Sequence, residues 1–277
     1  MLTLYKIFKF IFRWLLPASL RYPLARGIAR LVCRFNRRRR GVIVGNLTPL
    51  VGAEKARKLA PVLLGNFLMT AVDFFCPRTD IPRITPIENL NYLEKAYRKT
   101  KKVIAVTAHL GHWELGLPCL VYRGYPITGV YAPYRDDEIV SWIHKHRNPD
   151  AQWISATRGA VEACIETVQK GRILGMVADI PFGEKGRRVT MAGHHAHLPL
   201  GPWAIAVRSE ATVIPAFILR EKPGLYRIVF QEPIVPPTEG SFRKKMEHMQ
   251  DIFKNHLENY LLRYPTQWGV LQPFWDK

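Results

Sequence analysis

The sequence has few cysteines and few acidic residues. Cys33, Cys76, Cys119 and Cys164 lie far apart, and no two of them have the spacing of a metal-binding or redox pair. We therefore expect reduced, buried thiols in a protein that faces the cytosol. Aspartate and glutamate total 22 against 41 lysines and arginines, which gives a formal net charge of +19. This charge indicates an anionic partner, either a membrane surface, a nucleic acid or a phosphorylated substrate.

The start of the chain lacks an apolar run long enough to span a bilayer. Residues 1–16 are largely aliphatic and aromatic, but Pro17 ends the run short of the roughly 20 residues that a spanning helix needs. Lys6, Lys9 and Arg13 would lie along one narrow stripe of a helix. A secretory signal would carry its charges before the apolar core and not inside it. The pattern is typical of a helix lying in the bilayer interface, and a helix packed on the protein core is the alternative.

Two further helices are predicted before the main domain. Residues 21–40 form a basic helix that ends in four arginines, which we interpret as an anchor to anionic lipid, with a solvated face as the alternative. Residues 53–75 carry apolar side chains at helical spacing, which ordinary packing explains. We predict an interfacial helix and basic anchor over 1–40, a helical appendage over 41–86 and an α/β domain over 87–277.

The α/β domain is predicted from alternating strands and helices. An apolar content of 48% excludes general disorder. The alternation predicts a mostly parallel or mixed central sheet flanked by helices. The expected strands are 103–108, 127–131, 173–178, 187–191, 195–199, 212–219 and 225–231, and the expected helices are 90–99, 112–123, 136–147, 159–169, 201–207 and 242–263.

A histidine and a glutamate follow the first buried strand. Residues 103–108 form an apolar run that suits a strand buried on both faces, and open α/β sheets place ligands at the carboxyl ends of such strands. His109 and Glu114 would be about 140° apart on one helix. They can meet if His109 stays in the turn and Glu114 lies in the first helical turn. We expect a general base and the carboxylate that orients it.

The same pieces, taken in order, resemble a known family. They are 107–114 (TAHLGHWE), 130–133 (VYAP), 158–159 (RG), 178–179 (AD), 201–202 (GP), 211–215 (ATVIP) and 263–268 (RYPTQW). Together they resemble the bacterial lipid A biosynthesis acyltransferases, which include the phosphatidylinositol mannoside acyltransferases. The resemblance covers nearly the whole chain. It departs at His112, where asparagine is common, and in residues 180–185.

The resemblance implies a glycerolipid-acyltransferase-like fold and a membrane-associated enzyme. Such an enzyme moves a fatty acyl chain from an acyl carrier protein or coenzyme A thioester to a hydroxyl of a lipid or glycolipid, such as a lipid A precursor. His109 would be the base and Glu114 its partner, with no cofactor and no metal. The expected location is the cytoplasmic face of the inner membrane, as a peripheral or monotopic protein on an anionic surface, with no nucleic acid bound.

Four further residues are candidates for the site. Arg158 suits an oxyanion or a phosphate, and a surface salt bridge is the alternative. Asp179, after a buried strand, is either a second orienting carboxylate or a helix cap. Lys185 and Arg187 are candidates to grip phosphopantetheine or an acidic carrier, although such side chains are solvated by default.

Other interpretations remain open from the sequence. His112 with His194, His195 and His197 suggests a metal, but the spacing fits neither a helical zinc motif nor a finger, and a polar turn is favoured. Trp203, Trp268 and Trp275 are expected to be core or interface aromatics. Alternative functions are a nucleic-acid-binding protein, a thioester hydrolase using the same base, and a catalytically inactive membrane scaffold.

Overall fold

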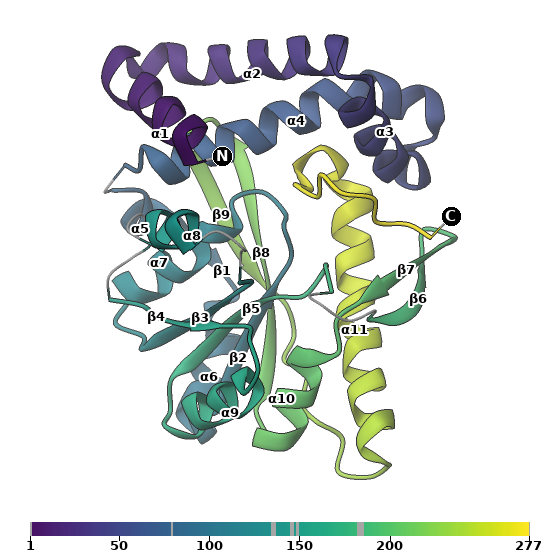
Figure 1. Ribbon diagram of the computed structural model, residues 1–277. Helices are drawn as coiled ribbons and strands as arrows, with labels where there is room; N and C mark the ends of the chain where they lie inside the picture. Colours follow the sequence, from purple (N-terminus) through teal and green to yellow (C-terminus); the bar gives the residue numbers. More distant parts are fainter. Residues whose placement is uncertain are drawn as a thin grey trace.

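A seven-stranded sheet forms the centre of the protein (Figure 1), and the computed structural model describes residues 2–78, 80–133, 137–144, 147, 150–181 and 186–276. The strands are ordered β1-β9-β8-β2-β5-β3-β4. The strands β8, β2, β5, β3 and β4 run parallel, β9 is antiparallel to β8, and β1 is parallel to β9. Their bounds are β1 Ile87–Glu88, β2 Val103–Thr107, β3 Ile127–Tyr131, β4 Gln152–Ser155, β5 Ile173–Val177, β8 Thr212–Lys222 and β9 Leu225–Phe230. The predicted α/β class with a mostly parallel sheet is confirmed.

The strand β2 lies inside the sheet, between β8 and β5. Val103, Ile104 and Val106 are fully buried, so side chains on both faces of this strand are in the core. This burial is the reason that the strand is a continuous apolar run and does not alternate. The polar residues that follow it therefore start at the carboxyl edge of a rigid, central strand.

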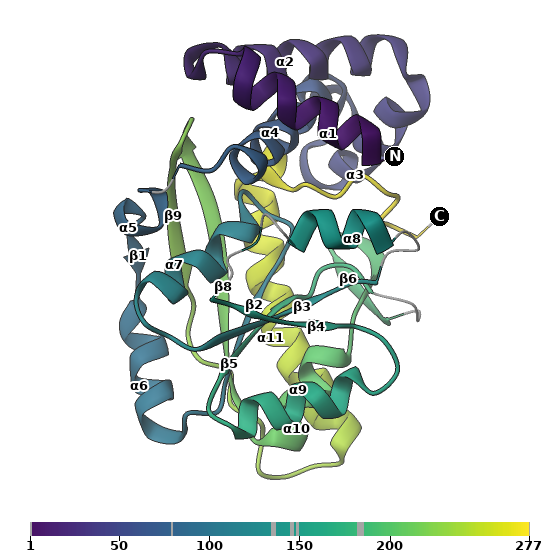
Figure 2. The ribbon, with the colours of Figure 1, turned by 60° about the vertical axis from the view of Figure 1, so that its left-hand side comes forward.

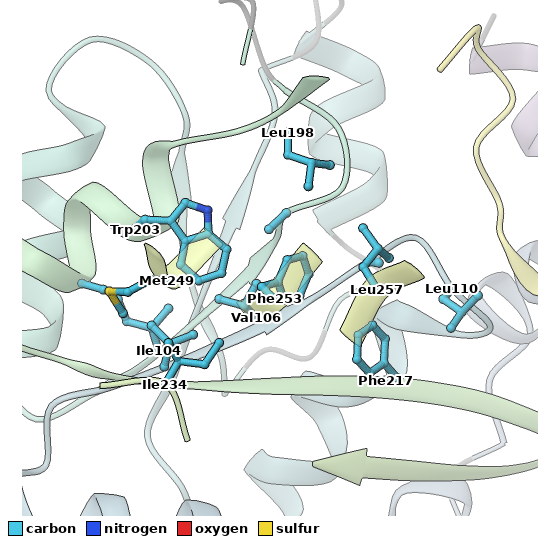
Figure 3. Close-up of a cluster of buried hydrophobic side chains, with 14 of the residues drawn as sticks. Ile104, Val106, Leu110, Leu198, Trp203, Phe217, Ile234, Met249, Phe253 and Leu257 are labelled. Carbon is cyan, nitrogen blue, oxygen red and sulfur yellow. The ribbon is translucent and has the colours of Figure 1, made fainter. Parts of the chain in front are cut away.

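Helices cover both faces of the sheet (Figure 2). One face packs against α9, α10 and α11, where Phe253 lies 5.4 Å from Trp203 and 6.2 Å from Phe217 between ring centroids. Figure 3 shows these three rings within the cluster of buried aliphatic side chains. The other face packs against α6 and α7. The bounds of these helices are α6 Leu90–Thr100, α7 Gly116–Tyr122, α9 Ala160–Gln169, α10 Gly201–Ser209 and α11 Phe242–Arg263.

Four N-terminal helices lie together at one end of the molecule, beside the upper ends of β8 and β9 in Figure 1. They are α1 Leu2–Phe10, α2 Ala18–Phe35, α3 Arg37–Val51 and α4 Ala53–Phe75, and a π-helical turn, Ile11–Leu15, extends α1. The sequence predicted one basic helix over 21–40, and this is wrong. Asn36 ends α2 and its side chain caps α3 by accepting a hydrogen bond from the Arg39 backbone N–H, so the four arginines open a new helix.

The helix α4 has the length and hydropathy of a membrane span, the one helix among the described residues that does. Half of its most apolar window is buried inside the protein, against α2 and α3. Leu63 and Leu64 belong to this packing and are almost inaccessible. Packing therefore accounts for the apolar stripe of α4.

The remaining elements connect the sheet to its surroundings. The strands β6 Arg187–Met191 and β7 His194–Leu198 pair with each other in a separate antiparallel ribbon, in the register expected of a hairpin. The short helices α5 Ile81–Ile84 and α8 Asp137–His144 lie in the connectors before β1 and after β3.

Candidate active site

The loop after β2 is fixed by backbone hydrogen bonds on both sides. The Gly111 N–H donates to the Gln267 carbonyl at 2.9 Å, and the His112 N–H donates to the Ile218 carbonyl at 3.3 Å. Gly111 has φ +62°, and a Cβ at this position would lie 1.9 Å from the Ile218 oxygen. Only glycine allows the loop to approach β8 this closely. The strand, the glycine and the C-terminal tail together fix where His109 lies.

The imidazole of His109 is held by Asp179. His109 Nδ1 lies 2.8 Å from Asp179 Oδ1, and the His109 backbone N–H donates to Oδ2 at 3.0 Å. The indole N–H of Trp268 donates to the same Oδ2, also at 3.0 Å. Asp179 follows β5, the parallel neighbour of β2, and is fully buried. Of the two predicted roles for Asp179, the position matches the orienting carboxylate and not the helix cap.

The two groups stabilise each other's charged form. Burial alone would raise the pKa of Asp179, but His109, Trp268 and the His109 backbone N–H outweigh it and lower this pKa. Burial alone would lower the pKa of His109, and the charge of Asp179, their hydrogen bond and the charge of Glu114 instead raise it. Because an ionised carboxylate can only accept, Nδ1 carries the proton of the neutral ring. The other ring nitrogen, Nε2, is then the basic one.

The expected contact between His109 and Glu114 is wrong. Glu114 pairs with Arg147, whose Nη2 donates to Oε1 at 2.9 Å and whose Nε donates to Oε2 at 3.3 Å. Arg147 also lies over the Trp153 ring, 4.1 Å from its centroid. Glu114 is the middle residue of a short 3-10 turn, Trp113–Leu115, while Asp179 follows the adjacent strand and lies directly beside His109. The neighbouring strand therefore supplies the carboxylate that the sequence assigned to the local turn.

A large cavity opens beside His109. Its volume is about 1,020 Å³, and its wall is mostly apolar. Among the described lining residues, the carboxylate of Glu114, the guanidinium of Arg147 and the imidazole of His109 are the acidic and basic side chains. The volume lies at the upper end of the roughly 300–1,000 Å³ typical of small-ligand pockets. The arrangement places a basic nitrogen in the wall of a space suited to an apolar substrate.

The other candidates do not meet at this site. Arg158 is exposed in the loop before α9; its neighbours Thr157 and Ala160 line the cavity, whereas Arg158 does not. Arg187 pairs with Asp251 of α11. Lys185 lies outside the described residues. The structure therefore gives Arg187 an ion pair with α11 and places Arg158 between residues that line the cavity.

The histidines considered for a metal are separated. His194, His195 and His197 lie on the β6–β7 ribbon, and the His197 ring pairs with Asp276. His112 is buried against Tyr226, with 5.2 Å between ring centroids, and burial lowers its pKa to about 4. Within the described part of the chain, no three histidine, cysteine, aspartate or glutamate side chains are placed to bind a metal.

Sequence reasoning missed two residues of the site. Trp268 was expected to be a core or interface aromatic, and it is buried in the core, but its N–H also donates to Asp179. Arg147 was not singled out at all. Its pairing with Glu114 spans 33 residues and has no local signal. For Trp268, the one available signal was its place in the 263–268 motif. That motif indicates that this segment is part of the family pattern, but it does not indicate the contact with Asp179.

The comparison with protein families decides the class of this site. The family model described as bacterial lipid A biosynthesis acyltransferase matches residues 2–277. The chain belongs to this family. The predicted family is thereby confirmed, and with it an acyltransferase of lipid biosynthesis that acts on a lipid acceptor and an acyl donor.

Individual members are distant from this chain. The lipid A biosynthesis lauroyltransferase of Escherichia coli K12 is 24% identical over 241 residues, which are 82% of this chain and 77% of that protein. The phosphatidylinositol mannoside acyltransferase of Mycobacterium tuberculosis (strain CDC 1551 / Oshkosh) is 22% identical over 193 residues, 68% of this chain and 59% of that protein. The chain thus aligns with somewhat over half of that second relative.

A solved acyltransferase structure also aligns. It is the 1-acyl-sn-glycerophosphate (LPA) acyltransferase PlsC of Thermotoga maritima, with 16% identity and a TM-score of 0.40, over 88% of this chain and 98% of that one.

Proposed function

We propose that this family member transfers a fatty acyl chain from a thioester to a lipid hydroxyl, with His109 as the general base. The observation that carries the proposal is the imidazole in the wall of a large apolar cavity, with its Nδ1 held by a buried carboxylate. An alcohol is a poor nucleophile at neutral pH, so it needs a base that removes its proton as the new bond forms.

In the proposed reaction, the acceptor oxygen attacks the thioester carbonyl carbon while Nε2 takes the hydroxyl proton. The tetrahedral intermediate collapses, the carbon–sulfur bond breaks, and the imidazolium returns the proton to the leaving thiolate. The products are an ester and a free thiol. Asp179 stabilises the imidazolium between these steps, and Trp268 and the His109 backbone hold Asp179.

We assign Glu114 a different role from the one that the sequence suggested. It holds the Arg147 guanidinium in the cavity wall, between Glu114 and the face of Trp153. Arg147 keeps N–H groups beyond the two bonded to Glu114, and guanidinium binds oxyanions and phosphates well. We propose that Arg147 contacts the polar end of a substrate, and that Arg158 contributes at the entrance.

For the substrates, we propose an acyl carrier protein or coenzyme A thioester as donor and a glycolipid, such as a lipid A precursor, as acceptor. The support comes from the names of two relatives, a lipid A lauroyltransferase and a phosphatidylinositol mannoside acyltransferase. Each name refers to a lipid that carries sugar. Both relatives are distant, so the acceptor is a separate proposal from the reaction type.

The proposed location is the cytoplasmic face of the inner membrane, with the N-terminal helices on an anionic surface. The first 53 residues contain eleven lysines and arginines and no acidic residue. Large apolar side chains on the same helices are exposed, including Phe10, Trp14, Leu31 and Phe35. Cations beside exposed aromatic and aliphatic side chains suit anionic headgroups and the acyl boundary beneath them.

The reaction is tested with purified protein, a lauroyl or palmitoyl thioester and a lipid A precursor in vesicles. We expect acylated lipid from the native protein and none from a folded His109→Ala variant, with folding checked by circular dichroism. Retained transfer in that variant would refute the base. Free fatty acid as the sole product, with or without acceptor, would identify a hydrolase instead.

A further inference from the structure

The cavity beside His109 reaches both faces of the sheet. Successive side chains of a strand point to opposite faces. On β3 and β5, Gly129 and Gly175 face α7, because a Cβ at either position would meet Leu117. Val130 and Met176, the next residue on each strand, therefore face the opposite side, and all four residues line the cavity.

One part of the cavity, the α7 limb, runs between α7 and the sheet. Its lining includes Ala105, Leu117, Ile127 and Ile173. Ala105 is partly accessible although it lies in the middle of a central strand, as expected if it faces open space. The limb extends from the last to the first residues of β3 and β5, four residues along each strand, or about 13 Å at 3.3 Å per residue.

The second part, the α9 limb, lies on the other face under α9 and α10. Its lining includes Val130, Met176, Ala160, Cys164 and Ile205. It extends along α9 from Ala160 to Cys164, about 6 Å at 1.5 Å per residue, so it is the shallower limb. Its wall is apolar, because these five side chains are hydrophobic and Cys164 is buried.

The sheet separates the two limbs, and they join at the carboxyl edge where His109 lies. A fatty acyl chain whose carbonyl lies beside His109 can occupy one limb, and the other limb then stays free. The deeper limb suits the donor, because a whole acyl chain must be buried before its carbonyl reaches the base. Water finds few polar partners in a largely apolar space, so a hydrocarbon chain is the favoured occupant of the second limb.

We infer that the α9 limb is a second hydrocarbon site, which holds part of an acyl chain of the lipid acceptor while the donor chain occupies the α7 limb. This inference rests on the proposed function for the identity of the two lipids. It makes acceptor recognition depend on a chain of the acceptor as well as on its headgroup, and it brings both lipids to His109 from opposite faces of one sheet.

The test counts palmitate, carrying a ¹³C-labelled carboxyl, bound to the full chain below the aggregation threshold of the fatty acid. The native protein should bind two equivalents with separate carboxyl resonances. Ala105→Phe fills the α7 limb and Ala160→Phe fills the α9 limb, with the same change of side chain on opposite faces. Each variant should bind one equivalent, and each should lose a different resonance.

A competitor identifies which limb serves the donor. S-hexadecyl phosphopantetheine is the unreactive thioether of the arm that both candidate donors share. It should displace the palmitate retained by Ala160→Phe and leave the palmitate retained by Ala105→Phe. Displacement in both variants would mean that both limbs serve the donor. One equivalent in the native protein, or two in Ala160→Phe, would overturn the second site.

Two controls keep the outcomes separate. Phe35→Ser on the exposed surface of α2 should still bind two equivalents, so a loss there would mean surface binding and would count against the inference. Ala105→Leu and Ala160→Leu, which are milder, replace any phenylalanine variant that does not fold. If the native protein binds two palmitates but transfers no acyl chain, the proposed function is refuted and the second site is not. If it transfers acyl chains but binds one palmitate, the second site is refuted and the proposed function is not.

Discussion

Among the charged side chains around His109, Asp179 has the strongest effect on the proposed base. Its carboxylate is fully buried and accepts from the imidazole, a backbone N–H and an indole N–H. A buried carboxylate with three donors stays ionised, and its charge favours the imidazolium that forms during proton transfer. Glu114 acts on the same ring only through its charge, because its oxygens are bonded to Arg147.

This difference predicts unequal effects of two similar substitutions. Asp179→Asn should lower kcat by about 10²–10⁴-fold, because the amide neither stabilises the imidazolium nor fixes the tautomer. Glu114→Gln also removes one negative charge, but Asp179 still accepts from His109 Nδ1, so kcat should fall less. The effect should appear mainly in KM, because Glu114 holds the Arg147 side chain that we propose contacts the substrate. Steady-state kinetics of both variants decide this, and a larger kcat loss in Glu114→Gln would contradict the assignment.

The pH dependence of activity follows from the pKa of His109. The base acts when neutral and its pKa is raised, so activity should increase with pH through a value above that of free histidine. Trp268→Phe removes one donor from Asp179, which concentrates charge on the carboxylate and favours the imidazolium further. The acidic limb of the kcat/KM profile should therefore move to higher pH in this variant.

Trp203→Phe is the matched control for that prediction. Trp203 is also fully buried in the same core, and its N–H donates to the Pro199 carbonyl, away from Asp179. Both variants should lose some stability, but Trp203→Phe should keep the native pH profile. Equal profiles for the two variants would show that Trp268 only fills space.

At the scale of elements, a buried polar network joins α4 to β8 and β9. Arg220 Nη1 donates to Asp73 Oδ2 at 2.7 Å, and Arg220 Nη2 donates to Thr70 Oγ1 at 2.8 Å. The Tyr226 hydroxyl also bonds Asp73, and the Thr70 hydroxyl donates to the Gly111 carbonyl at 2.9 Å. The helix that carries the N-terminal layer is therefore bonded directly to the loop of His109.

Breaking this network should be costly. Arg220→Met leaves the Asp73 carboxylate buried without its cation, and we expect a loss of about 3–5 kcal/mol in the free energy of unfolding, measured with urea. Adding Asp73→Leu removes the stranded charge and should restore part of that loss. If Arg220→Met alone is as stable as the native protein, the ion pair between Arg220 and Asp73 contributes nothing to holding α4 in place.

For the protein as a whole, the main asymmetry is the cationic and apolar surface of α1, α2 and α3, which carry no acidic residue. Leu15 and Val235 are both 62% exposed, the first beside the cationic helices and the second after β9. If the N-terminal surface inserts into a bilayer, Leu15→Ser should weaken vesicle binding by on the order of tenfold, since burying a leucine contributes about 1.5–3 kcal/mol. Val235→Ser should leave binding unchanged.

Binding is measured by co-sedimentation with vesicles of phosphatidylglycerol and of phosphatidylcholine. The protein should prefer the anionic vesicles, and the preference should shrink with added salt as the arginines are screened. Equal affinity for both vesicle types at low salt would remove the electrostatic part of the proposal. Equal losses in Leu15→Ser and Val235→Ser would remove the part assigned to the N-terminal surface.

The sequence alone determined the elements that a short window can encode. A continuous apolar run identified β2, and helical spacing identified α4, because burial on two faces or on one stripe leaves a local pattern. The short strands β1 and β4 were missed, since two and four residues carry too little pattern. The ordered motifs of the whole chain were enough to identify the family.

Only the tertiary structure decided which side chains meet. The sequence placed His109 at the end of a buried strand, but it paired the histidine with Glu114, the nearest carboxylate along the chain. In the fold, parallel pairing of β2 with β5 brings Asp179, 70 residues away, to Nδ1, and the C-terminal tail adds Trp268. Strand order and long-range packing set these contacts, and neither is written in any local pattern of residues.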